Sequence, residues 1–400
     1  MSLDQLATDW SRALERELPD AVDLRHELHA HPEVSGQEVW TAQRVAAALE
    51  VPEAPTVART GRAVRFGPDD GPAVAVRAEL DGLPLRERSG VAYAAGGDAM
   101  HACGHDVHLA ALVALARSAP AEALPGGLLA VLQPREELSP SGAEDVVAEG
   151  VLARQDVRAI VGAHVQPRLP AGTVSADAGV VNASVDEFEV RMTGTGGHGA
   201  YPHLTDDCVG ALSAYVLAAP ALARAVVDPM RVCALSFGVL RAGGAANVIP
   251  SLASATGTLR AFDAVDRDRM LARLRDAAHT VAETYGCHGE LHVHASEPPL
   301  DNDPALAARA AHWVDAVGAG RRATFRSAGS DDFAYYGHAV PGLMLFVGCG
   351  DGADAGGMLH QDTFVPDDAL VGAVARALLA GYLAAAEMRL GSVSPPSQPA

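Results

Sequence analysis

The sequence contains no lysine, so all 30 basic residues among its 400 are arginine. This absence excludes lysine Schiff-base enzymes, including those that use pyridoxal phosphate, and Walker-type phosphate-binding loops. No stretch of about 18 uncharged apolar residues is present, which argues against a membrane span. Acidic residues outnumber basic ones by 50 to 30, for a formal net charge of −20. Nucleic acids and anionic membranes are therefore not expected partners.

Cysteine is scarce, with five residues, an odd number that includes no Cys-x-x-Cys pair. A disulfide framework is therefore not expected, and a reducing, cytoplasmic compartment is the simpler interpretation. Residues 1–16 carry acidic side chains and no long apolar core, which predicts an amphipathic helix and not a secretion signal. The last ten residues, 391–400 (GSVSPPSQPA), are predicted to form a disordered tail.

A chain of this length suggests two domains. In the first 180 residues, short apolar runs alternate with helical patterns such as 105–118 and 143–149; the runs are 62–66, 73–80, 127–132 and 159–165. This alternation predicts an α/β catalytic domain with a central sheet. Polar residues at strand ends line the ligand crevice of such sheets. Asp81, Glu136 and His164 lie at or just past such ends.

The pattern changes near residue 181. Strand patterns at 185–192, 232–240, 252–262 and 290–295 combine with helical patterns at 205–224 and 267–285. Their β-α-β-β-α-β order is that of a split ferredoxin-like unit. The α/β pattern resumes near Pro304 and continues to about residue 390. We therefore predict a catalytic domain of residues 1–180 and 298–390, interrupted by an inserted domain of residues 181–297.

Residues 100–108 (MHACGHDVH) place three imidazoles, one thiol and one carboxylate in nine positions. Cys103 and His105 are two apart, so an extended turn can direct both at one centre. Further candidate ligands end later apolar runs: Glu136, Glu137, His164 and His360. Each alone is more often an ordinary core residue, but adjacent carboxylates at a buried sheet end are costly without a cation. The ligands are scattered and mixed in type, unlike structural zinc, which indicates a hydrolytic metal site.

A set of five ligands that includes a bridging thiolate suits two metal ions that share and acidify a water molecule. Thiolate and imidazole favour Zn, Co or Ni, and carboxylate with imidazole also admits Mn. Glu136 and Glu137 then divide into one metal ligand and one general base, because adjacent residues on extended chain point opposite ways. This alternation does not decide which glutamate has which role.

The segment 194–199 (GTGGHG) matches G-x-G-x-x-G, but no acidic residue ends a second parallel strand about 20 residues later, so dinucleotide binding is weakly supported. A glycine-rich loop presenting His198 is preferred, with a plain surface loop as the alternative. Asn247 and Arg260 bracket a predicted strand. Arg260 could bind a substrate carboxylate with its forked guanidinium, or be an ordinary solvated arginine.

The chain resembles the dinuclear-metal amidohydrolases of the aminoacylase and carboxypeptidase superfamily. It is most similar to the branch of hippurate hydrolases, N-acyl-amino-acid amidohydrolases and auxin-conjugate hydrolases. Ten segments carry the resemblance, in family order over nearly the whole chain. They are RHELHAHPEVSGQE (25–38), RAELDGLP (77–84), MHACGHDVH (100–108), QPREE (133–137), GAHV (162–165), GGHGAYPH (196–203), NVIP (247–250), GTLR (257–260), GSDDF (329–333) and LH (359–360).

This resemblance implies a role for each candidate residue. The metal ligands would be Cys103, His105, Glu137, His164 and His360. Glu136 would be the general base and acid, and His198 would stabilise the oxyanion, reaching the active site of a neighbouring subunit. Asn247 and Arg260 would hold the substrate's carbonyl and carboxylate, and Asp81 would orient a site residue. The central sheet would be mixed, and the insertion would be a lid and dimerisation domain that joins a homodimer or a higher homo-oligomer.

Some residues depart from the branch. Glu79 stands where Asp is usual and Asp331 where Glu is usual, while Arg135 and residues 138–141 (LSPS) replace a small residue and a glycine run. These departures spare the ligands and affect the expected substrate pocket.

The predicted function is hydrolysis of N-acyl-L-amino acids with two divalent metal ions, Mn or Zn, with Co and Ni as alternatives. The acyl group and the amino acid stay open. The competing hypotheses are a dipeptidase or aminopeptidase of the same superfamily, and an inert metal- or ligand-binding protein.

Overall fold

The computed structural model describes residues 1–351 and 357–389, so the tail predicted to be disordered lies outside the described residues. The chain forms two compact units. The first comprises residues 1–179, 301–325 and those from 332 onward, and the second comprises 180–300 and 326–331. The segment 326–331, predicted to lie in the catalytic domain, belongs to the second unit. Its Ser327 amide donates to Val181 O at 2.9 Å, and its carbonyl accepts from Ala183 N at 3.1 Å.

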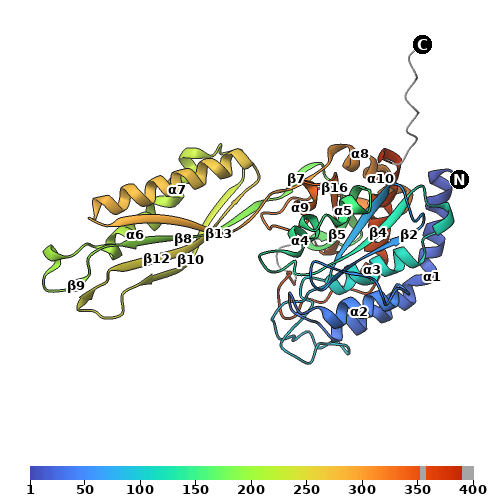
Figure 1. Ribbon diagram of the computed structural model, residues 1–400, viewed down its shortest axis with the longest axis horizontal. Coiled ribbons are helices and arrows are strands. Elements are labelled where there is room, and N and C mark those ends of the chain that lie inside the picture. Colours follow the sequence, from blue (N-terminus) through green and yellow to red (C-terminus); the bar gives the residue numbers. More distant parts are fainter. Residues whose placement is uncertain (352–356, 390–400) are drawn as a thin grey trace, which may run out of the picture. The chain divides into compact units, whose positions relative to one another are not determined.

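The first unit is built on an eight-stranded sheet of order β1-β2-β4-β3-β5-β16-β6-β15 (Figure 1). In that order the strands are Thr56–Val57, Gly61–Phe66, Gly127–Gln133, Ala73–Glu79, Val157–Pro170, Gly342–Gly350, Thr173–Ser175 and Arg321–Arg322. The β3–β4, β3–β5 and β5–β16 pairs are parallel, whereas β2–β4 and β16–β6 are antiparallel. The predicted mixed sheet is therefore confirmed. Strands β3 and β4 are buried along their whole length, as expected for central strands covered on both faces.

Helices flank this sheet. They are α1 (Leu3–Ala30), α2 (Val39–Ala48), α3 (His105–Arg117), α4 (Gly142–Ala148), α5 (Val151–Arg154), α8 (Pro304–Ala316), α9 (Ala334–Gly337) and α10 (Ala369–Arg389), with a 3-10 turn, η1, at Ala121–Ala123. Helix α10 packs against α1, α3, α8 and β5. By length and composition alone, this helix could cross a membrane. However, 83% of its apolar 18-residue stretch is buried, as in the core helix of a globular protein.

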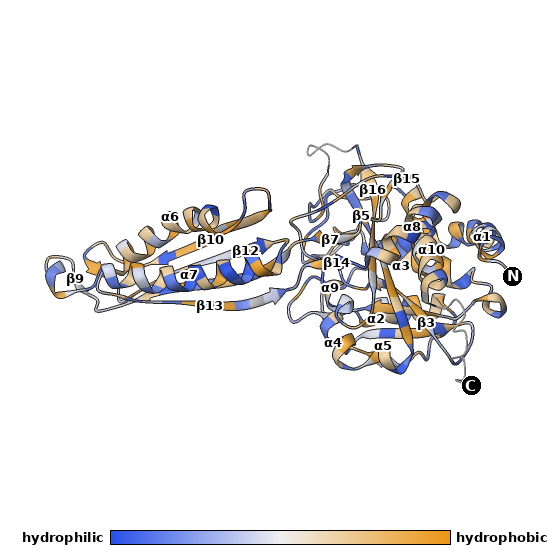
Figure 2. Cartoon of the chain, turned by 90° about the horizontal axis from the view of Figure 1, so that it is seen from above, coloured by the Kyte–Doolittle hydropathy of each residue, from blue (hydrophilic) through white to orange (hydrophobic). Residues whose placement is uncertain are grey.

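The second unit contains, in chain order, β8 (Ser184–Thr193), α6 (Cys208–Val226), β10 (Cys233–Ala242), β12 (Leu252–Ala261), α7 (Ala264–Thr284) and β13 (His288–Glu297). Its antiparallel sheet has the order β10-β12-β8-β13, which makes β10 and β13 the edges. Burial alternates along β8 and β12, and helices α6 and α7 pack on the buried face (Figure 2). This element order is the predicted β-α-β-β-α-β order.

Shorter elements complete the chain. A two-stranded sheet of β9 (Gly197–His198) and β11 (Val248–Ile249) lies in the second unit, together with a 3-10 turn, η2, at Pro202–Leu204. Strands β7 (Gly179–Asn182) and β14 (Leu300–Asn302) lie where the chain passes between the units. The helix predicted from residue 205 begins at Cys208, because the Asp207 side chain caps it by accepting from Gly210 N.

Candidate active site

The five predicted ligands come from four places in the first unit. Cys103 and His105 stand at the start of α3, Glu137 follows β4, His164 lies in β5, and His360 follows β16. Because β3, β4, β5 and β16 are mutually parallel through the central sheet, their carboxyl ends share one edge. That edge is where open α/β sheets place their ligands.

The structure brings these five side chains together. Ligand atoms of Cys103, His105 and Glu137 all lie within 4.8 Å of one another. His164 Nε2 is 3.4 Å from Cys103 Sγ, and His360 Nε2 is 3.1 Å from Glu137 Oε1. His360 is the most exposed, at 52% of its side chain, whereas Cys103, His105 and His164 are buried. Thiol, imidazole and carboxylate donors thus converge on one small volume.

Backbone carbonyls fix the tautomers of two of the histidines. The Nδ1 of His105 donates to the carbonyl of Asp81 at 2.8 Å, and the Nδ1 of His164 donates to that of Val165 at 2.7 Å. A carbonyl only accepts, so in the neutral ring Nδ1 keeps the proton and Nε2 is the nitrogen that can bind a metal. Within the described part of the chain, His105 Nε2 is buried without a hydrogen-bond partner. A buried, unsatisfied nitrogen beside a thiol and carboxylates fits a metal-ligand position.

The electrostatics of the cluster also fit a cation. Burial raises the pKa of Cys103 well above its usual value, and the charges of Glu137 and Glu136 raise it further. Burial would lower the pKa of His105, but the Glu79 charge and the Asp81 hydrogen bond raise it to about 10. Burial opposes ionisation of Glu137, yet its hydrogen bond with His360 and the His105 charge lower its pKa. The ionised carboxylates therefore attract positive charge, which a divalent ion would supply.

Glu136 lies beside this cluster. Its Oε2 is 3.8 Å from His105 Nε2, and its side chain is 11% exposed. Both glutamates thus reach the His105 region, and these contacts alone do not divide their roles.

Asp81 contacts two candidate site residues. Its Oδ2 accepts from the backbone amide of Glu137 at 3.0 Å and from Ser35 Oγ at 2.6 Å. Its Oδ1 is 3.7 Å from His105 Nδ1. Burial would raise the pKa of Asp81, but the hydrogen bond and charge of His105 lower it. The carboxylate is therefore placed to hold the Glu137 backbone and the His105 ring.

Potential ligand atoms of a second set of side chains also lie within 4.8 Å of one another. This set comprises Glu79, His105, His108 and His164. His108 is not free to bind a metal, because its Nδ1 donates to Glu79 Oε2 at 2.9 Å and its Nε2 accepts from Val165 N at 3.0 Å. Neither His108 nor Glu79 is among the site residues predicted from the sequence. The available signal was the charged pair Arg77 and Glu79 in an otherwise apolar strand pattern, AVAVRAE.

That charged pair belongs to a buried network. Arg77 contacts Glu79, and its Nη2 donates to Asp332 Oδ1 at 2.7 Å. Gln133 donates to the same carboxylate at 2.7 and 2.9 Å and accepts from Tyr336 Oη at 2.9 Å. Buried charges are tolerated when paired in this way, so this network supports the ends of β3 and β4, next to which the candidate ligands lie.

Arg135, one of the departures from the branch pattern, turns inward. Its side chain is only 3% exposed, its Nη1 donates to Pro140 O at 2.7 Å, and its guanidinium pairs with Asp145. Its backbone amide donates to Glu38 at 2.9 Å. Arg135 therefore anchors the loop that follows the glutamate pair.

The other predicted site residues lie in the second unit. His198, on β9, accepts a hydrogen bond from Ala200 N at its Nδ1, and the carbonyl of Asn247 accepts from Gly199 N. Arg260 lies near the other end of the sheet, where its Nη1 donates to Ala328 O at 2.9 Å. Arg260 is eight residue steps along β12 from Leu252, which lies beside the β9–β11 end. At about 3.3 Å per residue, Arg260 is roughly 26 Å from that end.

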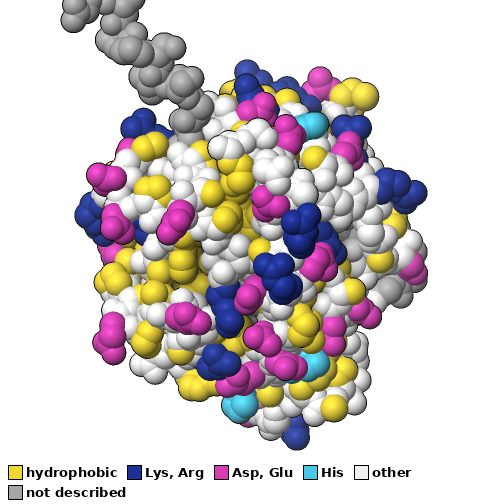
Figure 3. All heavy atoms as spheres, turned by 90° about the vertical axis from the view of Figure 1, so that its right-hand side faces the viewer, with side chains coloured by type: hydrophobic (Ala, Val, Ile, Leu, Met, Phe, Trp, Pro, Cys, Tyr) yellow, Lys and Arg dark blue, Asp and Glu magenta, His cyan; other side chains and the backbone are white. Residues whose placement is uncertain are grey.

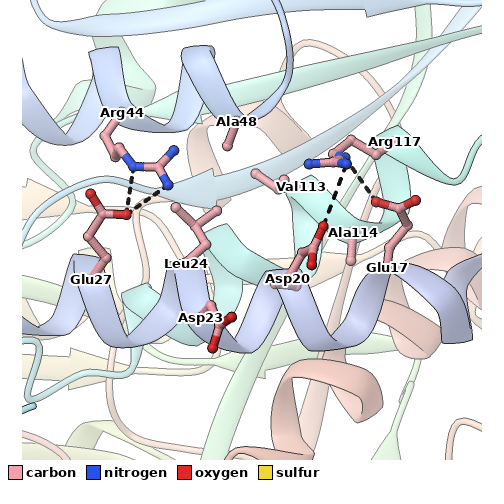
Figure 4. A pocket seen from close by; sticks show the side chains of 11 residues that line it. Glu17, Asp20, Asp23, Leu24, Glu27, Arg44, Ala48, Val113, Ala114 and Arg117 are labelled. Carbon is pink, nitrogen blue, oxygen red and sulfur yellow. Dashed lines mark hydrogen bonds and ion pairs between the residues drawn. The ribbon is translucent and has the colours of Figure 1, made fainter.

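A pocket of the first unit lies away from the candidate ligands. It has a volume of about 280 Å³ and lies between α1, α2 and α3 (Figure 4). Its charged rim is paired, with Arg117 bound to Glu17 at 2.9 Å and Arg44 to Glu27 at 2.7 Å. The face seen in Figure 3 likewise intersperses acidic and arginine side chains. This pocket contains none of the predicted site residues.

Comparison with known proteins agrees with this geometry. Residues 75–380 match the peptidase family M20/M25/M40. Two Bacillus subtilis (strain 168) proteins are similar in sequence. An N-acetylcysteine deacetylase is 32% identical over 82% of this chain and 87% of its own length, and an N-acetyl-L-cysteine deacetylase is 31% identical over 90% and 85%.

A solved structure is similar over nearly its full length. It is a Bacillus subtilis protein described as a dinuclear metal binding peptidase from the M20 family. It has a TM-score of 0.78 and 29% identity, and the match covers 92% of this chain and 98% of that one. The resemblance read from the sequence motifs is confirmed. This chain belongs to peptidase family M20/M25/M40 and is a hydrolase of amide bonds.

Proposed function

We propose that this protein hydrolyses the amide bond of N-acyl-L-amino acids that carry a free carboxylate. The observation that carries the proposal is the convergence of Cys103, His105 and Glu137 within 4.8 Å, with His164 and His360 in contact with them. The similar deacetylases are named for an amino acid whose nitrogen carries an acetyl group. The same bond type is therefore proposed for this chain.

Two divalent metal ions, Mn or Zn, with Co or Ni as alternatives, would be held by Cys103, His105, Glu137, His164 and His360. When bound, they would supply an acidified water and Lewis-acid polarisation of the carbonyl. Glu136 accepts the proton of the attacking water and delivers it to the leaving nitrogen. We assign the base role to Glu136 and the ligand role to Glu137 from the family pattern, and contacts of Glu137 with Cys103, His105 and His360 support it.

Asp81 acts as a positioning residue in this scheme. It holds the amide of Glu137 and the carbonyl-bound ring of His105 in place. His198 stabilises the developing oxyanion, since such donors act where charge appears in the transition state. Asn247 binds the scissile carbonyl, and Arg260 binds the substrate carboxylate with its forked guanidinium.

The separation within the second unit supports a site shared between subunits. Arg260 lies near one end of β12, and His198 lies on the small sheet beyond Leu252 at its other end, which is about 26 Å from Arg260 by the strand rise. A single inserted domain cannot place both on one small amino acid. We therefore propose a homodimer, or a higher homo-oligomer, in which His198 and Asn247 come from one copy and Arg260 from the other.

The surface of the second unit offers a face for this assembly. Helix α6 has a single charged residue, Arg224, yet only 22% of its apolar 18-residue stretch is buried. Leu217 on its outer side is 81% exposed. Neighbouring β10 is a sheet edge, and its Leu240 is 55% exposed. A helix with one charged residue beside an edge strand is a surface that a second copy can cover.

The test is a substrate panel assayed with Mn, Zn, Co and Ni. It pairs N-acetyl, N-benzoyl and long-acyl amino acids with the matching free-amine dipeptides. We expect turnover of the acylated, free-carboxylate compounds and little of the free amines. Preference for the free amines would favour a dipeptidase or aminopeptidase, which needs an acidic anchor for the amine. Absence of any amide cleavage with all four metals would favour an inert binding protein. A cytoplasmic location is proposed with this function.

A further inference from the structure

Two cysteines of the second unit lie against each other. Cys208 is the first residue of α6, and Cys287 directly precedes β13. Their sulfurs are 3.6 Å apart, although 79 positions separate them in sequence. A disulfide requires a sulfur–sulfur distance of about 2.05 Å, which small side-chain rotations and a slight backbone approach can supply.

The pair lies beneath the loop that carries His198. The backbone amide of Cys208 donates to Asp206 O at 3.1 Å. Asp206 in turn closes the loop through two hydrogen bonds with Thr195, one to its carbonyl at 2.9 Å and one from its amide at 2.7 Å. The adjacent Asp207 amide donates to Tyr285 O at 3.4 Å, two residues before Cys287. A shift at either cysteine is therefore transmitted to both ends of the loop.

We propose that Cys208 and Cys287 form a peroxide-sensitive pair, whose oxidation to a disulfide tethers the base of the His198 loop. The crosslink itself does not depend on the proposed function, whereas its effect on turnover rests on that function. Nothing in the metal cluster is involved, since both sulfurs belong to the second unit.

The reaction balances with hydrogen peroxide as the oxidant. Cys287 keeps 7% of its surface accessible and Cys208 none, so Cys287 reacts first. Its sulfur attacks one peroxide oxygen, the O–O bond breaks, and a sulfenic acid and one water form. The Cys208 sulfur then displaces hydroxide from that sulfenic acid, and its own proton converts the hydroxide to a second water. Two thiols are oxidised to one disulfide, and one peroxide is reduced to two waters.

The reaction is expected to be slow at neutral pH. Burial raises the pKa of Cys208 and, together with the adjacent Cys208 thiol, raises that of Cys287 to about 12. Both sulfurs are then mostly protonated, and the thiolate is the reactive form. The pair therefore responds to sustained exposure to peroxide and not to brief pulses.

The experiment treats the metal-loaded, full-length protein with hydrogen peroxide, alkylates the remaining thiols, and maps peptides without reduction. We expect a crosslinked peptide pair containing Cys208 and Cys287, lighter by two hydrogen atoms than the sum of its parts and separated by dithiothreitol. Cys208→Ser and Cys287→Ser remove it, whereas Cys233→Ser, a matched change of a more accessible cysteine in the same unit, retains it. Complete oxidation of Cys233 shows that the exposure to peroxide was sufficient. If Cys208 and Cys287 are then found alkylated or over-oxidised separately, without a crosslink, the proposal is overturned.

Turnover is measured on the same samples. Oxidation of the wild type should lower kcat by about 10- to 100-fold, since small displacements of catalytic groups have costs of this size, and dithiothreitol should restore it. The Cys208→Ser variant should resist this loss. A crosslink with unchanged turnover would support the modification site and overturn its link to His198. Because the crosslink is detected by peptide mapping, it can be tested even if the protein has no amide hydrolase activity.

Discussion

His108 donates a hydrogen bond of 2.9 Å from its Nδ1 to Oε2 of Glu79, which leaves its Nε2 to accept from the amide of Val165. Its ring contacts that of His164 edge to face, with centroids 4.7 Å apart. The histidine next to the candidate ligands is thus a support for β5. It holds Val165, the residue of β5 that follows His164.

We expect His108→Phe to weaken metal binding, because the aromatic ring fills the same space but leaves Val165 N without its acceptor and Glu79 Oε2 without its His108 donor. Loss of such outer-shell contacts typically lowers metal affinity by about 10- to 100-fold. Isothermal titration with Zn or Mn measures the effect. Glu79→Asp, which restores the residue usual in the branch, is the matched control and should lose less. An affinity within about twofold of wild type in His108→Phe would remove its positioning role.

The role of Glu136 is tested by Glu136→Gln, which keeps the shape of the side chain and removes its basicity. General acid–base catalysis contributes about 10²- to 10⁴-fold, so kcat should fall by that amount while metal content stays unchanged. Metal analysis and single-substrate kinetics report both quantities. Activity within about an order of magnitude of wild type would assign the proton transfer to another group.

Metal binding should release protons. Without a cation, the pKa of Cys103 lies well above its usual value and that of His105 is about 10, so both hold their protons at pH 7. Both bind metal only after deprotonation. The apparent metal affinity should therefore decrease as the pH is lowered from 8 to 6. Titration calorimetry in buffers of different ionisation enthalpy counts the protons released.

Cys103→Ser tests the thiol's share of this effect. The variant should bind metal more weakly and release fewer protons, because a hydroxyl is a poorer ligand and does not ionise in this range. Unchanged metal stoichiometry and affinity would show that Cys103 is not a ligand.

A shared active site can be tested by complementation. Glu136→Gln and His198→Ala variants should each be inactive as pure dimers. When they are mixed and allowed to exchange subunits, hybrid dimers contain one intact site, so about a quarter of wild-type activity should return. Each variant exchanged with itself is the control. No recovery despite proven subunit exchange would place His198 and Glu136 in the same subunit or outside the reaction.

The proposed dimer face is tested by Leu217→Asp on α6. A buried charge at a subunit interface is costly, so the variant should be monomeric by sedimentation and inactive with its metals bound. Val265→Asp on α7, a residue that is 56% exposed, is the matched control and should behave as wild type. A wild-type protein that is monomeric and fully active would contradict the assembly.

The sequence was sufficient to predict the mixed sheet and the element order of the second unit. The central strands are largely apolar runs, with Arg77 and Glu79 as exceptions in β3, and the inserted strands alternate. The membership of residues 326–331 was not predictable, because it depends on hydrogen bonds of Ser327 with distant residues. Local pattern contains no information on such pairings.

For the site, motif order predicted residues that the fold brings together, from Cys103 to His360. The two-residue spacing from Cys103 and the family pattern selected His105, but neither explains why His108 is not a ligand, since both are histidines on the first turn of one helix. Their difference arises from tertiary neighbours: Nε2 of His108 meets the amide of Val165, whereas Nε2 of His105 faces the carboxylates. Orientation of an imidazole is decided by which strand packs beside it.

The carbonyl-bound rings of His105 and His164 have an evolutionary consequence. Their acceptors belong to the main chain, which no point substitution deletes. Side chains around the candidate site can therefore change while both imidazoles keep the same nitrogen directed at its centre. Substitutions that alter substrate selectivity therefore need not alter the orientation of the two histidines.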